Sequence, residues 1–153
     1  MATSTVSVER EIHADPAAVW RVVTGLDRAT EVFSAITAVE RLEGEGYDVG
    51  VRWRETRKVF GKEETEEMWV SAIEPMRSTT VEARSGGAHY TTRFFLDSSD
   101  LGTQLRLEFS VKPLEKGMAK LAWKVFGSFG MKATQKALVQ DLADIAAAVE
   151  SRD

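Results

Sequence analysis

The chain has 153 residues, a formal net charge of −4 and no cysteine, which fits one domain and excludes disulfides, thiolate metal sites and cysteine nucleophiles. The negative charge argues against non-specific nucleic-acid binding, which needs a basic surface. The N-terminus lacks the basic and apolar regions of a signal peptide, and no run approaches the roughly 20 apolar residues of a membrane span, so we expect a single cytoplasmic domain over residues 1–153 without integral membrane association.

The N-terminal quarter predicts a strand, two short helices and a second strand. Val6, Val8 and Ile12 alternate with polar residues, which is typical of a half-buried strand. Asp15 followed by Pro16 is a strong helix start, because aspartate caps the N-terminus and proline suits the first helical position. The expected elements are a strand over 6–12, a helix over 16–24, a helix over 27–33 and a strand around 39–42.

A β-hairpin follows, with strands over 50–60 and 63–73 joined by Gly61-Lys62. This turn predicts a register in which Trp53 lies opposite Val70. A slip of one residue would move every side chain to the other face, so the alternation determines which residues point inward. The predicted inner face holds both apolar and charged residues, namely Val51, Trp53, Glu55, Arg57, Glu66, Met68, Val70 and Ala72.

Three further strands are expected over 78–84, 90–96 and 105–111, and then a helical C-terminal region from about Leu114 to Ser151. Apolar residues recur there at the spacing of an amphipathic helix. Two glycines within Gly127–Gly130 each cost about 1 kcal/mol in a helix. We therefore expect a break at this point, with the last helix starting near Met131 and residues 116–126 forming either a lid or part of one continuous helix.

The order and spacing of four motifs resemble the START-like helix-grip superfamily (SRPBCC), and within it the polyketide cyclase/dehydrase-like group. The motifs are VSVEREIHADPAAVWRVVTGLD, GYDVGVRWRETR, IEP and DLGTQLRLEF. The resemblance covers nearly the whole chain. It implies an α+β fold in which a seven-stranded curved antiparallel sheet wraps around a long C-terminal helix, with two short helices between strands 1 and 2. It also implies a mostly apolar ligand cavity between sheet and helix, and it implies no shared catalytic motif.

Charged residues on the predicted inner face are candidates for the polar part of such a cavity. Glu55, Arg57 and Glu66 fall on the cavity side of the hairpin, where a few polar groups fix a ligand's orientation. The alternative is a half-exposed salt bridge at the open end of the sheet, since most charged residues stay in contact with water.

The sixth strand adds a tyrosine and a histidine. Tyr90 is expected to point inward, and His89 outward unless a bulge at Gly86-Gly87 turns it. Histidine suits acid–base catalysis near neutral pH. His89, Tyr90 and Glu55 are therefore the candidates for a catalytic group. The apolar candidates for the pocket are Trp53, Met68, Phe94, Phe109, Phe126 and Phe129.

Three functions stay open on the sequence. The first is binding of a small hydrophobic or aromatic ligand, such as a lipid, a polyketide or an isoprenoid-like molecule. The second is a polyketide aromatase/cyclase or dehydratase acting in the same cavity. The third is a protein-interaction module with a packed core. No metal site and no cofactor are predicted, because no set of converging ligands and no dinucleotide-binding loop is found. The expected partner is a small hydrophobic molecule, and the protein is a monomer or a homodimer.

Overall fold

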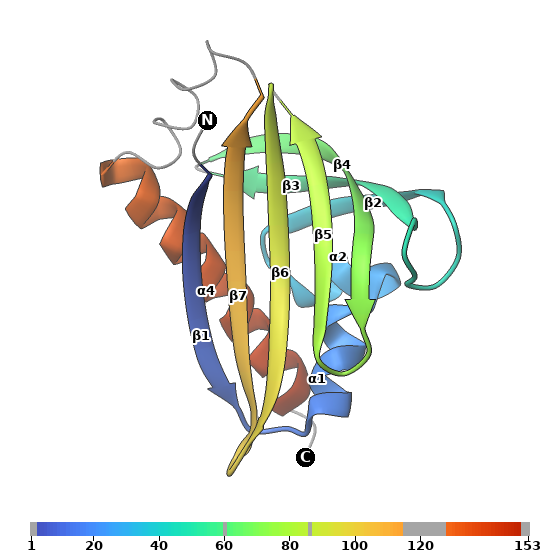
Figure 1. The fold of residues 1–153 in the computed structure, drawn as a ribbon, viewed down its shortest axis with the longest axis vertical. Coiled ribbons are helices and arrows are strands. Elements are labelled where there is room, and N and C mark those ends of the chain that lie inside the picture. The colour runs from blue at the N-terminus through green and yellow to red at the C-terminus, as the bar shows by residue number, and fades with distance from the viewer. Residues whose placement is uncertain (1–2, 60, 86, 115–127, 151–153) are drawn as a thin grey trace.

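The computed structural model describes residues 3–59, 61–85, 87–114 and 128–150 (Figure 1). Seven strands and several helices make up one α+β unit. In chain order they are β1 (Ser4–Ile12), α1 (Pro16–Val23), the 3₁₀ helix η1 (Leu26–Arg28), α2 (Ala29–Val32), β2 (Ile36–Glu43), β3 (Arg52–Val59), β4 (Lys62–Glu74), β5 (Ser78–Ser85), β6 (Ala88–Ser99), β7 (Gly102–Pro113) and α4 (Ser128–Glu150).

The seven strands form one curved sheet in the order β1-β7-β6-β5-β4-β3-β2, and all neighbours are antiparallel. Figure 1 shows α4 running across one face of this sheet, with α1 and α2 at one end of it. The short helices lie between β1 and β2. The predicted helix-grip architecture is therefore confirmed. In the described part of the chain, no helix is long and apolar enough to cross a membrane.

Local sequence explains where α1 begins and how β7 starts. The Asp15 carboxylate accepts a hydrogen bond from the Ala18 backbone N–H at 2.8 Å, and Pro16 occupies the first turn. Gly102 has φ +145°, and a Cβ built there would lie 2.5 Å from the carbonyl oxygens of Ile12 and Ala14. Only glycine fits this close approach of two backbones.

The core has two parts. The larger joins α4 and α1 to the β1, β6 and β7 side of the sheet, with Ile12, Val19, Leu105, Leu142 and Ile145 fully or almost fully buried. The smaller lies under β3, β4 and β5, and its buried members are Leu26, Val51, Trp53, Val70 and Val81. The buried residues of α4 and those of the hairpin thus belong to separate hydrophobic clusters.

The hairpin register differs from the expected one by two residues. Trp53 lies opposite Met68 rather than Val70, because Val59 pairs with Lys62 and the turn falls one residue earlier than Gly61-Lys62. A shift of two preserves the faces of a strand, so Trp53, Val51 and Val70 are buried as expected. A bulge between Val70 and Ala72 reverses the alternation afterwards, and Ala72 is exposed, contrary to the expectation.

The C-terminal helix α4 begins at Ser128, within the segment where a break was expected. Gly130 therefore lies inside the helix, where it is buried. The proposed lid over residues 116–126 lies outside the described residues.

Candidate functional site

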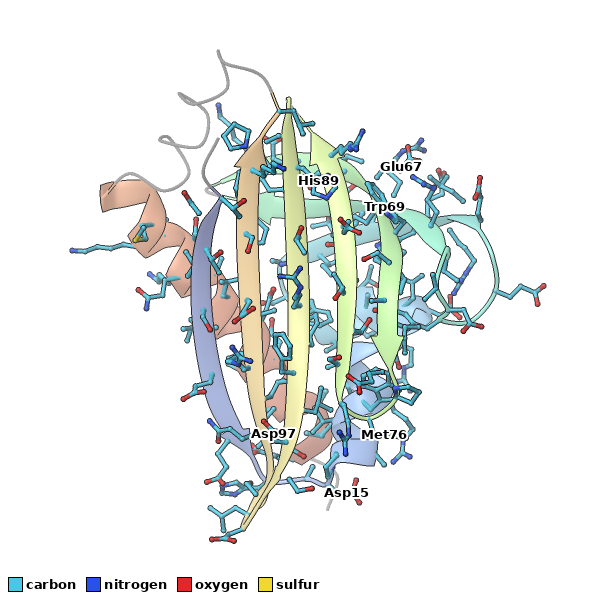
Figure 2. The ribbon with its side chains drawn as sticks, in the orientation of Figure 1. Asp15, Glu67, Trp69, Met76, His89 and Asp97 are labelled. Carbon is cyan, nitrogen blue, oxygen red and sulfur yellow. The ribbon has the colours of Figure 1, made fainter. Side chains whose placement is uncertain are left out.

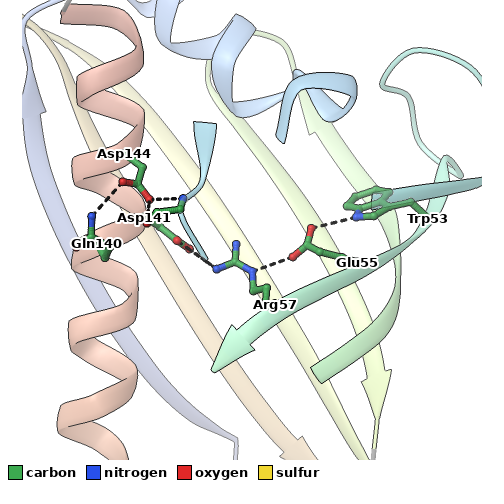
Figure 3. A network of polar contacts seen from close by, with 7 residues as sticks. Trp53, Glu55, Arg57, Gln140, Asp141 and Asp144 are labelled. Carbon is green, nitrogen blue, oxygen red and sulfur yellow. Dashed lines mark hydrogen bonds and ion pairs between the residues drawn. The ribbon is translucent and has the colours of Figure 1, made fainter. Parts of the chain in front are cut away.

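A chain of polar side chains crosses from the hairpin to α4 (Figure 3). The Trp53 indole N–H donates to Glu55 Oε1 at 3.2 Å, and Arg57 Nε donates to Glu55 Oε2 at 2.9 Å. Arg57 Nη1 then donates to Asp141 Oδ1 at 3.1 Å and Oδ2 at 3.0 Å. Strand alternation places Trp53, Glu55 and Arg57 on one face of β3, and Arg57 reaches Asp141 of α4 from that face (Figure 3).

Burial makes this network electrostatically strong. Glu55 is 8% exposed and Asp141 5% exposed, and charges removed from water need partners. Burial raises the pKa of Asp141 from 3.8 to about 6, although Arg57 opposes the shift. Burial by itself lowers the pKa of Arg57, but the charges of Asp141 and Glu55 outweigh it and raise that pKa. Arg57 therefore stays protonated, whereas burial makes Asp141 easier to protonate than an exposed aspartate.

Glu66 lies beside this network, directly opposite Glu55 in the β3–β4 register. Burial raises the pKa of Glu66, the negative charge of Glu55 raises it further, and Arg57 partly offsets both. Burial, together with the charges of Glu66 and Glu64, also raises the pKa of the Tyr90 hydroxyl. The carboxylates of Glu66 and Glu64 thus act electrostatically on Tyr90 of β6.

Half-buried aromatic side chains lie on the inner face of β6 and β7. Tyr90 of β6 and Phe109 of β7 stack with ring centroids 5.7 Å apart and an interplanar angle of 20°. Tyr90, Phe94 and Phe109 pack against the larger core cluster but keep part of their surface accessible. Met68 does the same at the smaller cluster. Accessible aromatic surface next to a few polar groups is the usual composition of a small-molecule site.

The structure places most of the predicted site residues on one face of the sheet. Trp53 lies on this face too, but it is only 4% exposed and belongs to the smaller core cluster. Phe126 and the side chain of Phe129 lie outside the described residues. Glu55, Arg57, Glu66, Met68, Tyr90, Phe94 and Phe109 lie on the inner face.

His89 is apart from this group. Its Nε2 lies 2.6 Å from Glu82 Oε1, and its ring meets Trp69 edge-on with centroids 6.0 Å apart. Figure 2 shows His89, Trp69 and Glu67 on the face of the sheet turned away from α4. The β5–β6 register is continuous through Ser85 and Ala88, so no bulge turns His89 inward. His89 therefore does not join Tyr90 and Glu55.

Asp141 is the site residue that the sequence prediction missed. It lies three residues after Leu138 and four before Ile145, both of which belong to the apolar stripe of α4. A charged residue within such a stripe is the signal that would have pointed to it, because buried carboxylates require a partner. Its partner Arg57 is 84 positions away in the sequence.

Two hollows open on the other side of the sheet, and neither includes a predicted site residue. One, of about 640 Å³, lies by the β4–β5 turn and includes Met76, Phe95 and Asp97. The other, of about 350 Å³, is lined by Arg52, Glu67, Trp69 and Arg84. Among the described residues, no group of histidine and acidic side chains is placed to hold a metal ion.

Comparison with known families agrees with this geometry. Residues 3–150 match the family model described as polyketide cyclase/dehydrase and lipid transport. The chain belongs to this family. The predicted resemblance to the SRPBCC superfamily is therefore confirmed. No curated protein matches the chain in sequence.

Solved structures share the fold of this polyketide cyclase/dehydrase and lipid transport domain at low identity. The Zhui aromatase/cyclase from Streptomyces sp. R1128 superposes with a TM-score of 0.80 at 17% identity, covering 99% of this chain and 96% of the other. TTHA0849 from Thermus thermophilus gives 0.77 at 18%, covering 97% and 98%. Ginseng major latex-like protein 151 from Panax ginseng gives 0.76 at 14%, covering 96% and 97%. At these identities, the likeness establishes the fold alone.

Proposed function

We propose that this protein binds a small hydrophobic ligand with an aromatic or polycyclic body between the inner face of the sheet and α4. The observation that supports the proposal most directly is the stacked pair of Tyr90 and Phe109, which keep accessible ring surface beside a buried polar network. An aromatic ligand stacked on such a pair gains both apolar burial and favourable ring geometry.

The polar network gives the ligand a fixed orientation. Arg57 is held by Glu55 on one side and Asp141 on the other, so its position is set before a ligand arrives. Preorganised polar groups lower the ordering cost of binding. The ligand's apolar body would therefore lie over Tyr90, Phe94 and Phe109, with its polar end toward Arg57 and Glu66.

A cyclase or dehydratase reaction in the same cavity is the second candidate. The observation that favours it is the pKa of Asp141, which burial raises to about 6. A carboxyl group with that pKa both gives and takes a proton at neutral pH, as a general acid–base catalyst must. Tyr90, on the inner face of β6, would supply a hydrogen-bond donor to a ligand carbonyl.

Native mass spectrometry of protein purified from its own host tests the binding proposal. The expected result is a stoichiometric bound molecule, which denaturing extraction would then identify as apolar or aromatic. Incubating that molecule with the protein separates the two candidates, since an enzyme converts it and a binding protein returns it unchanged. A strictly polar bound molecule, such as a free sugar, would contradict the proposal.

A further inference from the structure

The polar end of the proposed site contains more acidic than basic groups. Glu55, Glu66 and Asp141 face inward there, and Glu64 extends the same face of β4 toward the solvent. Arg57 is the inward-facing cation among these described residues, and its Nε and Nη1 are already used by Glu55 and Asp141. If the aromatic pair binds a ligand as proposed, these acidic groups lie next to the ligand's polar end.

Glu66 is the acidic group of this set with which Arg57 forms no ion pair in the described part of the structure, since Arg57 pairs with Glu55 and Asp141. It lies directly opposite Glu55 and is half-buried. In the described part of the structure, Glu66 makes no hydrogen bond and no ion pair. Burial and the charge of Glu55 raise its pKa, Arg57 offsets part of that shift, and Glu64 adds to it. A carboxylate in this position is destabilised by its surroundings, so a positive charge brought close to it would be stabilised.

The ring faces of Tyr90 and Phe109 also favour a cation over an anion. Ring faces are the negative part of an aromatic quadrupole, so they attract cations and do not attract anions. Tyr90 is close enough to Glu66 for the carboxylate to raise the pKa of its hydroxyl, as burial also does. A ligand that stacks on Tyr90 and Phe109 therefore places its polar end within the field of Glu66.

We propose that the site selects aromatic or polycyclic ligands bearing a protonated amine and rejects ligands of the same shape bearing a carboxylate. This inference rests on the proposed function, because it specifies the ligand class of the same site. The amine would lie between Glu66 and the Tyr90 ring. A carboxylate there would face Glu66 and Glu55, with Arg57 already engaged by two carboxylates.

The test compares three probes with one aromatic body, namely naphthylmethylamine, naphthylmethanol and naphthoic acid. Their dissociation constants at neutral pH are measured by titration calorimetry. The amine is expected to bind at least about tenfold more tightly than the acid, as one half-buried charge contact would produce. The alcohol is expected between them. An acid that binds as tightly as the amine, or more tightly, overturns the inference.

Two variants test whether Glu66 causes the preference for the amine over the acid. Glu66→Gln is expected to reduce the amine-to-acid ratio by about tenfold, because it removes the unpaired carboxylate. It also removes a destabilised charge, so the variant is expected to fold. Glu67→Gln is the matched control, since Glu67 follows Glu66 in β4 but pairs with Arg52 at 3.2 Å on the other face. The amine-to-acid affinity ratio of Glu67→Gln should equal that of the parent protein. Equal ratios in Glu66→Gln and the parent overturn the inference.

The outcomes also separate this inference from the proposed function. If the three probes bind with equal affinity, the aromatic site stands and the charge preference is wrong. If none of them binds, and no other aromatic probe does, both the proposed function and this inference are wrong.

Discussion

Arg57 on β3 donates two hydrogen bonds to Asp141 on α4, at 3.1 and 3.0 Å, and so joins the C-terminal helix to the hairpin. The same guanidinium holds Glu55 at 2.9 Å. The Arg57 side chain is 29% exposed, whereas both carboxylates are almost fully buried. One partly exposed cation therefore pairs with two buried carboxylates, and several properties of the protein depend on it.

Replacing Arg57 by methionine should destabilise the fold at neutral pH. The change leaves Glu55 and Asp141 buried without a cation, which costs about 2–3 kcal/mol after allowance for the partial exposure of Arg57. Urea denaturation measures the free energy of unfolding. The matched control is Arg54→Met on the same strand. Arg54 pairs with Glu40 at 2.6 Å, but both side chains are exposed, so its loss should cost less than about 1 kcal/mol. Equal losses in the two variants would contradict this assignment.

The stability of the protein should depend on pH through Asp141. Its pKa is raised from 3.8 to about 6 by burial, so the folded state holds a proton that the unfolded chain has released. This contribution is complete below about pH 4 and is lost as the pH rises through about 6, with a total of roughly 3 kcal/mol. The raised pKa of Glu66 acts in the same direction.

Asp141→Asn isolates that contribution. The variant should show a flatter dependence of unfolding free energy on pH between about 4 and 6 than the parent protein, because the titrating group is gone. Denaturation curves recorded across this range give the comparison. Parallel curves for the two proteins would show that Asp141 does not titrate in this window.

Trp53→Phe tests how much the hydrogen bond from the Trp53 indole N–H to Glu55 contributes to stability. Phenylalanine keeps most of the buried volume but removes the N–H that donates to Glu55 at 3.2 Å. We expect a loss of about 1–2 kcal/mol in unfolding free energy, because a buried carboxylate loses one donor. Trp69→Phe on the other face is the control, with a smaller expected loss, because Trp69 is half-buried. A Trp53→Phe variant as stable as the parent would argue against the hydrogen bond.

Met76→Gly should stabilise the protein. Met76 has φ +65° in the exposed β4–β5 turn, a left-handed conformation that costs a residue with a Cβ about 1 kcal/mol. Glycine relieves that cost, and thermal unfolding should show a higher midpoint. Arg77→Gly, one residue later without positive φ, should instead lower the midpoint, because it only adds backbone freedom to the unfolded chain.

Much of the fold follows from side-chain periodicity. Alternation along β3 and β4 fixes which residues face inward, and this assignment survives a register error of two because the strand period is two. The bulge that exposes Ala72 leaves no clear mark in the sequence, since it arises from pairing with β5. Local patterns thus predict faces well, and they predict registers and bulges poorly.

The site could be predicted only in part for a related reason. Glu55 and Arg57 are recognisable as charges on an apolar face, two positions apart in one strand. Asp141 becomes their partner only when α4 lies across the sheet, and that contact joins segments 84 positions apart. Similarly, the alternation places Trp53 on the inner face, but only the structure shows that it is 4% exposed within the smaller core cluster.

Ligand binding on the inner face of the sheet is the central claim. The most direct test is the affinity of a neutral apolar dye, Nile red, for the parent protein, Phe109→Ala and Phe95→Ala. Phe109 stacks on Tyr90 inside, whereas Phe95 lies under Arg106 at 4.2 Å on the other face. We predict about a tenfold loss of affinity for Phe109→Ala and no change for Phe95→Ala, in line with losing one aromatic contact. A loss confined to Phe95→Ala, or equal in both variants, would contradict the claim.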